Sequence, residues 1–506
     1  MVMMKGSTMS QKNVDFVIVS APILNFYFPP AAPAVLKAVL QAAGHNCIAY
    51  DLSIKLRTDM ANNLSLYNLI DHYMQLQSSI RYGENENLFT LLDRKRTDLN
   101  PQANELYTNC LKTYAKGIID KTPTWVGTSV LSTNSIIFTY DLIKEIRNIN
   151  PKQKIVIGGS GLLEQSHGQT EESIKFGDVF KQKNLVDEVI YGEGEKAIVD
   201  LANGILLTDN KQIKDLDDIP YPDYSDYVDP YFNRETRISI TGSRGCIRNC
   251  AFCDIKHMWN KFVYRSARNI ADELIHHYKT SGFKWFYFTD SLINGSISEF
   301  RELSKIIIEE KRLNNLPNDL SIKGQYIFRP AKSTPPLDFD LMLEAGIDEL
   351  VIGVESGSPE VLHAMGKKYN REDIDYNMHH LDRVGILVRF LLIIGFPTET
   401  RKNFEETMDM LRDYKVYADR GTIACVNLSK TCAILENSPL GLHPEKWGVE
   451  FDKDGNWTTN DNDNIERAKR RLEAQNLCET LGYNIVYSNS QLNSIYESLT
   501  SRGSRV

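Results

Sequence analysis

Short apolar runs alternate with helical patterns over the first 210 residues of the chain. Each run is about the length of a buried strand, and the segments between runs place apolar residues at the spacing of an amphipathic helix. Strand, helix and strand repeated in this way predict a doubly wound parallel sheet with right-handed crossovers, a flavodoxin-like α/β domain over residues 14–210. The expected strands are 14–20, 46–52, 125–130, 154–157 and 188–191, with helices that include 31–43 and 135–149.

A second strand–helix series occupies residues 237–440. The spacing of its βα units predicts a full or partial (β/α) barrel. The region 441–506 is polar and predicts one further helix at 465–481, so a small C-terminal helical region is expected. The expected barrel strands are 237–241, 285–289, 322–328, 349–354 and 387–394, and the clearest helices are 269–281 and 297–310.

Three segments do not fit either series. Residues 1–13 are polar, and we expect them to be a disordered tail. The insertion 53–121 is too long for a loop without secondary structure and predicts a small helical excursion. Three prolines lie within 215–232, and proline disfavours helix at its own position and before it. We therefore expect an extended linker over 211–236.

The composition is that of an ordinary globular protein. Hydrophobic residues make up 42% of the 506 residues, and 58 basic against 66 acidic side chains give a net charge of −8. A negative net charge makes nucleic acid an unlikely partner. No apolar run reaches the roughly 18 residues of a membrane span, and the first residues lack the apolar core of a signal peptide. We expect no membrane association and a cytoplasmic protein.

Three of the eight cysteines crowd into one short segment that follows directly on a predicted strand. Cys246, Cys250 and Cys253 lie within eight residues, a spacing at which three thiolates can converge on one cuboidal cluster. Three ligands leave one iron of such a cluster open for a substrate or cofactor. Arg244 and Arg248 would offset part of the cluster's negative charge.

A zinc site is the alternative for the same segment. His257 follows Cys253 by four residues and could complete a Cys3His tetrahedron. The spacing alone leaves both metals open.

The pattern Cys-x3-Cys-x2-Cys resembles the signature of the radical S-adenosylmethionine (SAM) superfamily. The aromatic Phe252 before the third cysteine is part of that resemblance, which implies that it is a cofactor-binding residue. The resemblance also implies a [4Fe–4S] cluster on these cysteines whose open iron binds SAM, with reductive cleavage of SAM to a 5′-deoxyadenosyl radical. Three later strand ends resemble the family's SAM-binding motifs. The implied cofactor-binding residues there are Asp290 and Ser291, Glu355 and Ser356, and Gly395.

Small residues follow the strands of the first domain, where a flat ligand can approach the backbone. This set resembles the cobalamin-binding domain found in front of many radical SAM enzymes, and the linker resembles that family's interdomain segment. Classical cobalamin enzymes supply a histidine from an Asp-x-His-x-x-Gly motif, which this chain lacks, so the domain could also have kept the fold and lost the cofactor. The implied cobalamin-binding residues are Pro29, Ser129, Gly158, Gly159, Ser160, Gly192 and Glu193.

The resemblance implies a cobalamin-dependent radical SAM enzyme, with methyl transfer to an unactivated carbon as the leading hypothesis. It also implies a small-molecule or peptide substrate and an external electron donor of the flavodoxin or ferredoxin type. Two alternatives stay open at this point. One is radical oxidation, cyclisation or rearrangement without methyl transfer, and the other is a metal-stabilised binding protein without catalysis.

Overall fold

The computed structural model divides the chain into two compact units. One unit comprises Met1–Ile213 with Asp218–Asn233, and the other comprises Lys214–Asp217 with Arg234–Val506. The residues it describes are 14–22, 29–70, 72, 101–132, 135–162, 175–207, 212–227, 236–428, 432–452 and 456–486. The predicted tail 1–13 lies outside them.

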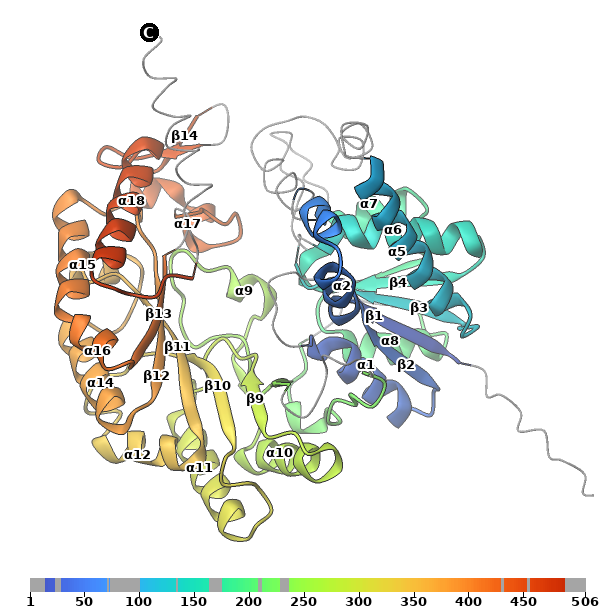
Figure 1. Cartoon of the computed structure of the whole chain (residues 1–506), viewed down its shortest axis with the longest axis horizontal. Helices are drawn as coiled ribbons and strands as arrows, with labels where there is room; N and C mark the ends of the chain where they lie inside the picture. Colours follow the sequence, from blue (N-terminus) through green and yellow to red (C-terminus); the bar gives the residue numbers. More distant parts are fainter. Residues whose placement is uncertain are drawn as a thin grey trace, which may run out of the picture. The chain divides into compact units, whose positions relative to one another are not determined.

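The first unit contains a five-stranded sheet in which every neighbouring pair is parallel (Figure 1). Its strand order β2-β1-β3-β4-β5 is that of a flavodoxin-like doubly wound sheet. In this order β2 lies on one side of β1 and the later strands β3, β4 and β5 lie on the other side. The predicted fold of this unit is confirmed. The strands are β1 Phe16–Ser20, β2 Cys47–Asp51, β3 Trp125–Ser129, β4 Lys154–Gly158 and β5 Glu188–Ile190.

Helices cover both faces of this sheet because its central strands are apolar on both sides. On β1, Phe16 and Ile18 belong to one buried cluster, and Val17 and Val19 belong to the other. The first cluster includes residues of α1 (Ala31–Ala42) and α8 (Gly194–Ala202). Helices of the second cluster are α2 Leu52–Ala61, α5 Pro101–Ile119, α6 Ile136–Ile149 and α7 Phe176–Gln182.

Only parts of the insertion 53–121 are among the described residues. Helices α2 and α5 lie at its two ends, and the residues between 73 and 100 lie outside the described residues. In the predicted linker, residues 212–227 contain one 3₁₀ helix, Leu216–Asp218, and no strand.

The linker is fastened to α1 by a buried lysine. The Lys37 side chain is 3% exposed, and its Nζ lies 3.0 Å from Asp223 and 2.7 Å from Asp226. Replacing Lys37 by methionine leaves two carboxylates without their cation, so we expect a loss of about 3 kcal/mol in unfolding free energy. Chemical denaturation checks this, with exposed Lys116→Met in α5 as the control. A loss no larger than that of the control would contradict it.

The second unit contains six parallel strands in the order β13-β12-β11-β10-β9-β6, which is the chain order of a partial (β/α) barrel (Figure 1). The predicted barrel is confirmed, and β13 is an additional strand that the sequence pattern did not indicate. The strands are β6 Ile238–Ile240, β9 Trp285–Phe288, β10 Ser321–Tyr326, β11 Ile347–Glu355, β12 Leu387–Leu392 and β13 Ile423–Leu428. The larger helices are α10 Ala267–Ser281, α11 Ile297–Arg312, α12 Pro336–Ala345, α14 Arg371–Val384 and α15 Arg401–Asp413.

The C-terminal region packs within this second unit. Its helix α18, Asn464–Thr480, contacts α15 and β13, and it buries Arg467, Arg470 and Arg471. Short elements precede it: α17 Pro439–Leu442 and the hairpin of β14 Glu450–Phe451 with β15 Trp457–Thr458.

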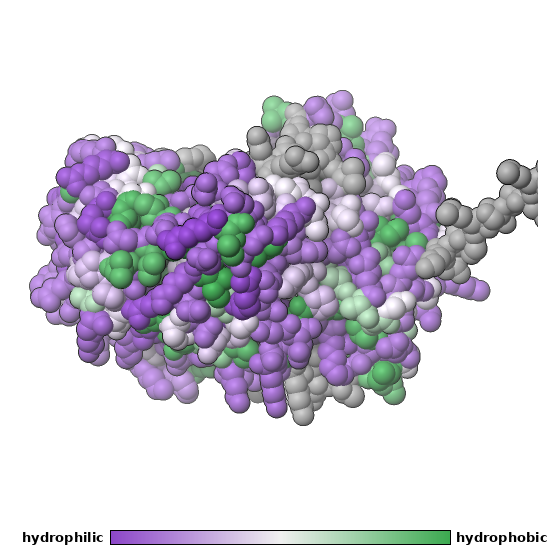
Figure 2. Space-filling view, turned by 90° about the horizontal axis from the view of Figure 1, so that it is seen from below, coloured by the Kyte–Doolittle hydropathy of each residue, from purple (hydrophilic) through white to green (hydrophobic). Residues whose placement is uncertain are grey.

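On the face drawn in Figure 2, hydrophilic residues predominate and hydrophobic side chains form separate small groups. Among the helices of the described residues, none combines the length and the hydropathy that crossing a membrane requires.

Candidate functional site

The cysteine segment, residues 242–253, follows β6, the first strand of the barrel. A two-stranded ladder, β7 Ser243–Arg244 against β8 Val263–Tyr264, closes the base of the loop that carries the three thiols. Gly245 has a φ of +80°, and a Cβ there would lie 2.5 Å from the carbonyl oxygen of Lys261. Glycine is therefore required where the two sides of the loop approach most closely.

All three thiols are half-buried and free. The backbone N–H of Arg248 donates to Cys246 Sγ at 3.4 Å, and Lys256 donates to the Cys246 carbonyl at 2.6 Å. Burial raises the pKa of Cys250, and burial with the neighbouring thiols raises the pKa of Cys253 to about 11. The three donors are soft sulfur atoms, and the basic residues Arg248 and Lys256 contact Cys246. This combination fits an iron–sulfur cluster.

The histidine of the zinc alternative is exposed to solvent. His257 lies in the short helix α9, Ile255–Met258. Within the described part of the chain, no group of three or more His, Cys, Asp and Glu side chains stands ready to hold a metal ion.

Asp290 is buried directly beneath the cysteine segment. Its carboxylate accepts hydrogen bonds from the Gly242 backbone N–H at 2.8 Å and from the Ser243 hydroxyl. Burial raises the pKa of Asp290 to about 7. Its neighbour Ser291 is half-buried. The carboxylate predicted to bind SAM thus fixes the strand that leads into the cysteines.

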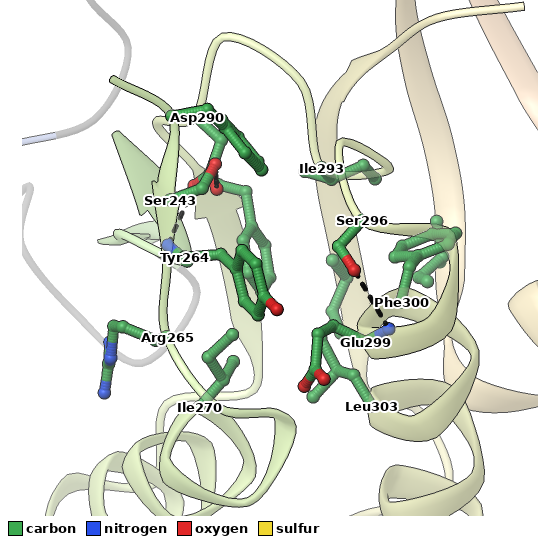
Figure 3. A pocket seen from close by; sticks show the side chains of 15 residues that line it. Ser243, Tyr264, Arg265, Ile270, Asp290, Ile293, Ser296, Glu299, Phe300 and Leu303 are labelled. Atoms are coloured by element: carbon green, nitrogen blue, oxygen red, sulfur yellow. Dashed lines mark hydrogen bonds between the residues drawn. The ribbon is translucent and has the colours of Figure 1, made fainter. Parts of the chain in front are cut away.

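A pocket opens beside this carboxylate, between the sheet and helices α10 and α11 (Figure 3). Its empty volume is about 480 Å³ including the open mouth, and most of its lining is apolar. Tyr264 stands on one side of the mouth, opposite Ser296 and Glu299 at the start of α11. The lining includes Asp290 together with Gly242 and Ser243, whose N–H and hydroxyl groups donate to its carboxylate. The pocket therefore lies next to the hydrogen bonds that hold the start of the cysteine segment.

The end of β11 carries a residue in an unusual backbone conformation. Glu355 has a φ of +67°, in the left-handed region that non-glycine residues rarely adopt. Its carboxylate pairs with Lys367 Nζ at 2.9 Å, and both side chains are less than 10% exposed. Such strain is concentrated at functional sites. The next residue, Ser356, is buried with its hydroxyl 3.0 Å from that of Thr407 on α15.

Gly395, at the turn after β12, is covered by the C-terminal helix. Its φ is +79°, and a Cβ there would lie 2.6 Å from the alkyl chain of Arg467. Its N–H donates to Glu399 at 2.9 Å, and Arg470 Nη1 donates to the Glu399 carbonyl at 2.6 Å. The strand end of Gly395, which the sequence predicts to bind SAM, is therefore shaped by the region after residue 441.

In the first unit, the predicted cofactor residues gather at the carboxyl ends of β3, β4 and β5. A Cβ on Gly159 would lie 2.3 Å from the Val130 carbonyl oxygen, and the Ser160 hydroxyl donates to the Leu131 carbonyl at 2.6 Å. Glu193 accepts from the Ile213 N–H. The others lie at the same strand ends or before α1: Ser129, Gly158, Gly192 and buried Pro29.

Unsatisfied buried oxygens lie close to these strand ends. Within the described residues, Thr128 Oγ1, Ser132 Oγ and one Asp51 oxygen have no hydrogen-bond partner. Buried polar atoms without partners cost free energy and indicate a missing water or ligand. Two hydroxyls that can donate and a carboxylate oxygen that can accept fit a bulky ligand with amide groups, such as cobalamin.

Residues 240–411 match the Radical SAM superfamily. The match begins at the end of β6 and includes the cysteine segment and the strand ends of Asp290, Glu355 and Gly395.

Residues 240–411 are a radical SAM domain.

Among curated proteins, cytidylyl-2-hydroxyethylphosphonate methyltransferase of Streptomyces wedmorensis is 26% identical over 220 residues, or 41% of this chain and 40% of that protein. The chain spans about half the length of the curated relatives that it matches.

Two solved structures share the fold over nearly the whole chain. One is the radical SAM methyltransferase TsrM from Kitasatospora setae with cobalamin and a [4Fe–4S] cluster bound; it is 17% identical with a TM-score of 0.59, over 86% of this chain and 80% of that one. The other is the cobalamin-dependent SAM radical enzyme OxsB; it is 14% identical with a TM-score of 0.61, over 97% of this chain and 71% of that one. At these identities the likeness establishes the two-domain fold.

The radical SAM domain contains an arginine pair, Arg248 and Arg329, of which the sequence indicated only Arg248. Arg329 follows β10 and donates to the backbone oxygens of Asn294 and Gly295 at 2.7 and 3.0 Å. Burial and the neighbouring Arg248 lower its pKa, and Cys246 acts in the opposite direction. The Nε atoms of Arg248 and Arg329 are buried without a hydrogen-bond partner. One N–H donor of each of these guanidinium groups thus remains available to an anion.

Lys367, Arg329 and Arg467 were all absent from the predicted site. Each lies outside the glycine and cysteine motifs that carried the prediction. A buried basic residue has no sequence signal of its own, because its burial depends on contacts between distant segments.

Proposed function

We propose that the protein is a cobalamin-dependent radical SAM methyltransferase that acts on an unactivated carbon of a small molecule or peptide. The observation that carries the proposal is the combination of a flavodoxin-like unit, with unsatisfied oxygens at its strand ends, and a radical SAM domain in one chain. When bound, the [4Fe–4S] cluster would supply the electron that cleaves SAM, and cobalamin would carry the methyl group.

The chain's own residues have separable tasks in this proposal. Cys246, Cys250 and Cys253 hold the cluster, and Asp290 fixes the strand that leads to them. The guanidinium groups of Arg248 and Arg329 bind the carboxylate of SAM. An external flavodoxin or ferredoxin provides the reducing electron.

The test is a product analysis. Protein reconstituted without oxygen with iron, sulfide and cobalamin should yield both 5′-deoxyadenosine and S-adenosylhomocysteine when it receives SAM and a reductant. Release of 5′-deoxyadenosine without S-adenosylhomocysteine would favour the radical reaction without methyl transfer. Protein that retains no cobalamin after this reconstitution would contradict the methyltransferase proposal.

Removing one guanidinium should weaken SAM binding. Replacing Arg329 by methionine removes a charge-assisted hydrogen bond of about 1.5–3 kcal/mol, so the dissociation constant for SAM should rise at least about tenfold. Equilibrium dialysis against the reconstituted protein measures it. Arg312→Met is the matched control, because the Arg312 side chain is 67% exposed at the end of α11. Equal affinities in the two variants would show that Arg329 does not bind SAM.

A further inference from the structure

A short segment after α13 (Pro359–Ala364) lies against the cysteine segment. The Ala251 N–H donates to the Met365 carbonyl at 2.9 Å. Gly366 has a φ of +79°, and a Cβ there would lie 3.3 Å from the Asn249 carbonyl oxygen. The backbone of residues 365 and 366 is thus fitted to the stretch between the first and third cysteines.

Lys367 extends from this segment toward the end of β11. Its Nζ donates to Glu355 Oε1 at 2.9 Å and to the Gly353 carbonyl at 3.1 Å. The same Nζ lies 5.5 Å from the centre of the Phe252 ring and 5.8 Å from that of Tyr369. Tyr369 completes the arrangement, because its hydroxyl also donates to the Gly353 carbonyl, at 2.6 Å.

The ammonium group of Lys367 is a buried positive charge held by hydrogen bonds. Its side chain is 7% exposed. Burial by itself lowers the pKa of Lys367, but the carboxylate of Glu355 more than offsets this, so the pKa is raised above its usual value. A charge in such a low-dielectric setting acts on its neighbours more strongly than one in water. Its neighbours are the ring that precedes Cys253 and the strained Glu355.

We propose that Lys367 is a positioning residue that raises the reduction potential of the cluster and holds Glu355 in its left-handed conformation. This inference rests on the proposed function, because it requires a cluster on Cys246, Cys250 and Cys253. Reduction adds one negative charge to the cluster, and a buried cation stabilises the product of that step more than the starting state. Loss of the cation should therefore make the cluster harder to reduce.

The experiment is a redox titration of the reconstituted protein, followed by electron paramagnetic resonance of the reduced cluster. In Lys367→Met the equilibrium constant for reduction should fall about tenfold, which for one electron is a shift of about 59 mV to more negative potential. Lys368→Met is the matched control, since Lys368 is the next residue and is exposed. Lys367→Arg keeps the charge and should retain most of the wild-type potential.

A second variant, with an expected potential shift of opposite sign, keeps the inference testable if Lys367→Met fails to fold. Glu355→Gln leaves the ammonium group without its counter-charge, so the potential should become more positive than that of the wild type. An unchanged potential in both Lys367→Met and Glu355→Gln, or an equal shift in Lys368→Met, would overturn the inference while the proposed function stands. Wild-type protein without iron and sulfide would instead overturn the proposed function, and this inference with it.

Discussion

Replacing Cys250 by alanine is expected to leave the protein without iron and sulfide after anaerobic reconstitution. The three thiols are the only cysteines of the barrel's first loop, and two thiolates are too few to hold a [4Fe–4S] cluster with one open iron. The loss should be essentially complete, with disappearance of the charge-transfer absorption of the cluster. Iron and sulfide analysis, with zinc measured in the same sample, provides the readout.

Cys110→Ser is the control for Cys250→Ala. Cys110 is also half-buried and free, but it lies on α5 of the first unit. It should retain the wild-type content of iron and sulfide. Zinc without iron in the wild type, or full iron content in Cys250→Ala, would show that the cysteine segment does not hold this cluster.

The second large effect is expected on stability, from Asp290→Ala. The substitution leaves the Gly242 N–H and the Ser243 hydroxyl buried without their acceptor. Each such group costs about 1–3 kcal/mol, so the unfolding free energy should fall by about 3 kcal/mol. Denaturant titration measures the change. Asp272→Ala is the control, because Asp272 is 46% exposed on α10 and its ion pair should contribute less than about 1 kcal/mol.

The same carboxyl group makes stability depend on pH. Burial raises the pKa of Asp290 from 3.8 to about 7, against the opposing hydrogen bonds from Ser243 and Gly242 and the charge of Arg265. Between about pH 4 and 7 the folded protein therefore binds more protons at this site than the unfolded chain does. The proton-linked part of the Asp290 contribution to stability is full below pH 4 and is lost as the pH rises through about 7.

Asp290→Asn removes this titration, so its unfolding free energy should fall less steeply over that range than that of the wild type. Glu399 has a raised pKa of about 7 as well, so some slope should remain in the variant. Identical slopes in the wild type and Asp290→Asn would contradict the assignment.

The sequence predicted both domains because their strands are apolar runs separated by helical patterns. In β1, the run from Phe16 to Ser20 is buried on both faces, which is the case that a continuous apolar run indicates. The strand β13, with the sequence IACVNL, was missed. Its burial depends on α18, which approaches from more than 30 residues away in the chain.

The candidate site could be predicted where it consists of local motifs. Three cysteines within eight residues are visible in the sequence. The hydrogen bonds that hold the cysteine segment in place are not, because their partners lie far apart in the chain. Asp290 was identified as a cofactor residue, but its carboxylate is engaged by Gly242 and Ser243. Lys367 and Arg467 act through contacts that form only when distant segments pack together.

The measurement that tests the central claim most directly is the release of 5′-deoxyadenosine from SAM. Reconstituted wild-type protein, SAM and dithionite are incubated without oxygen, and the nucleoside is quantified by mass spectrometry, with Cys250→Ala treated in parallel. We predict that 5′-deoxyadenosine accumulates in the wild-type sample and remains at background in the variant. Wild-type protein that contains iron and sulfide but releases no more 5′-deoxyadenosine than Cys250→Ala would contradict the radical SAM mechanism.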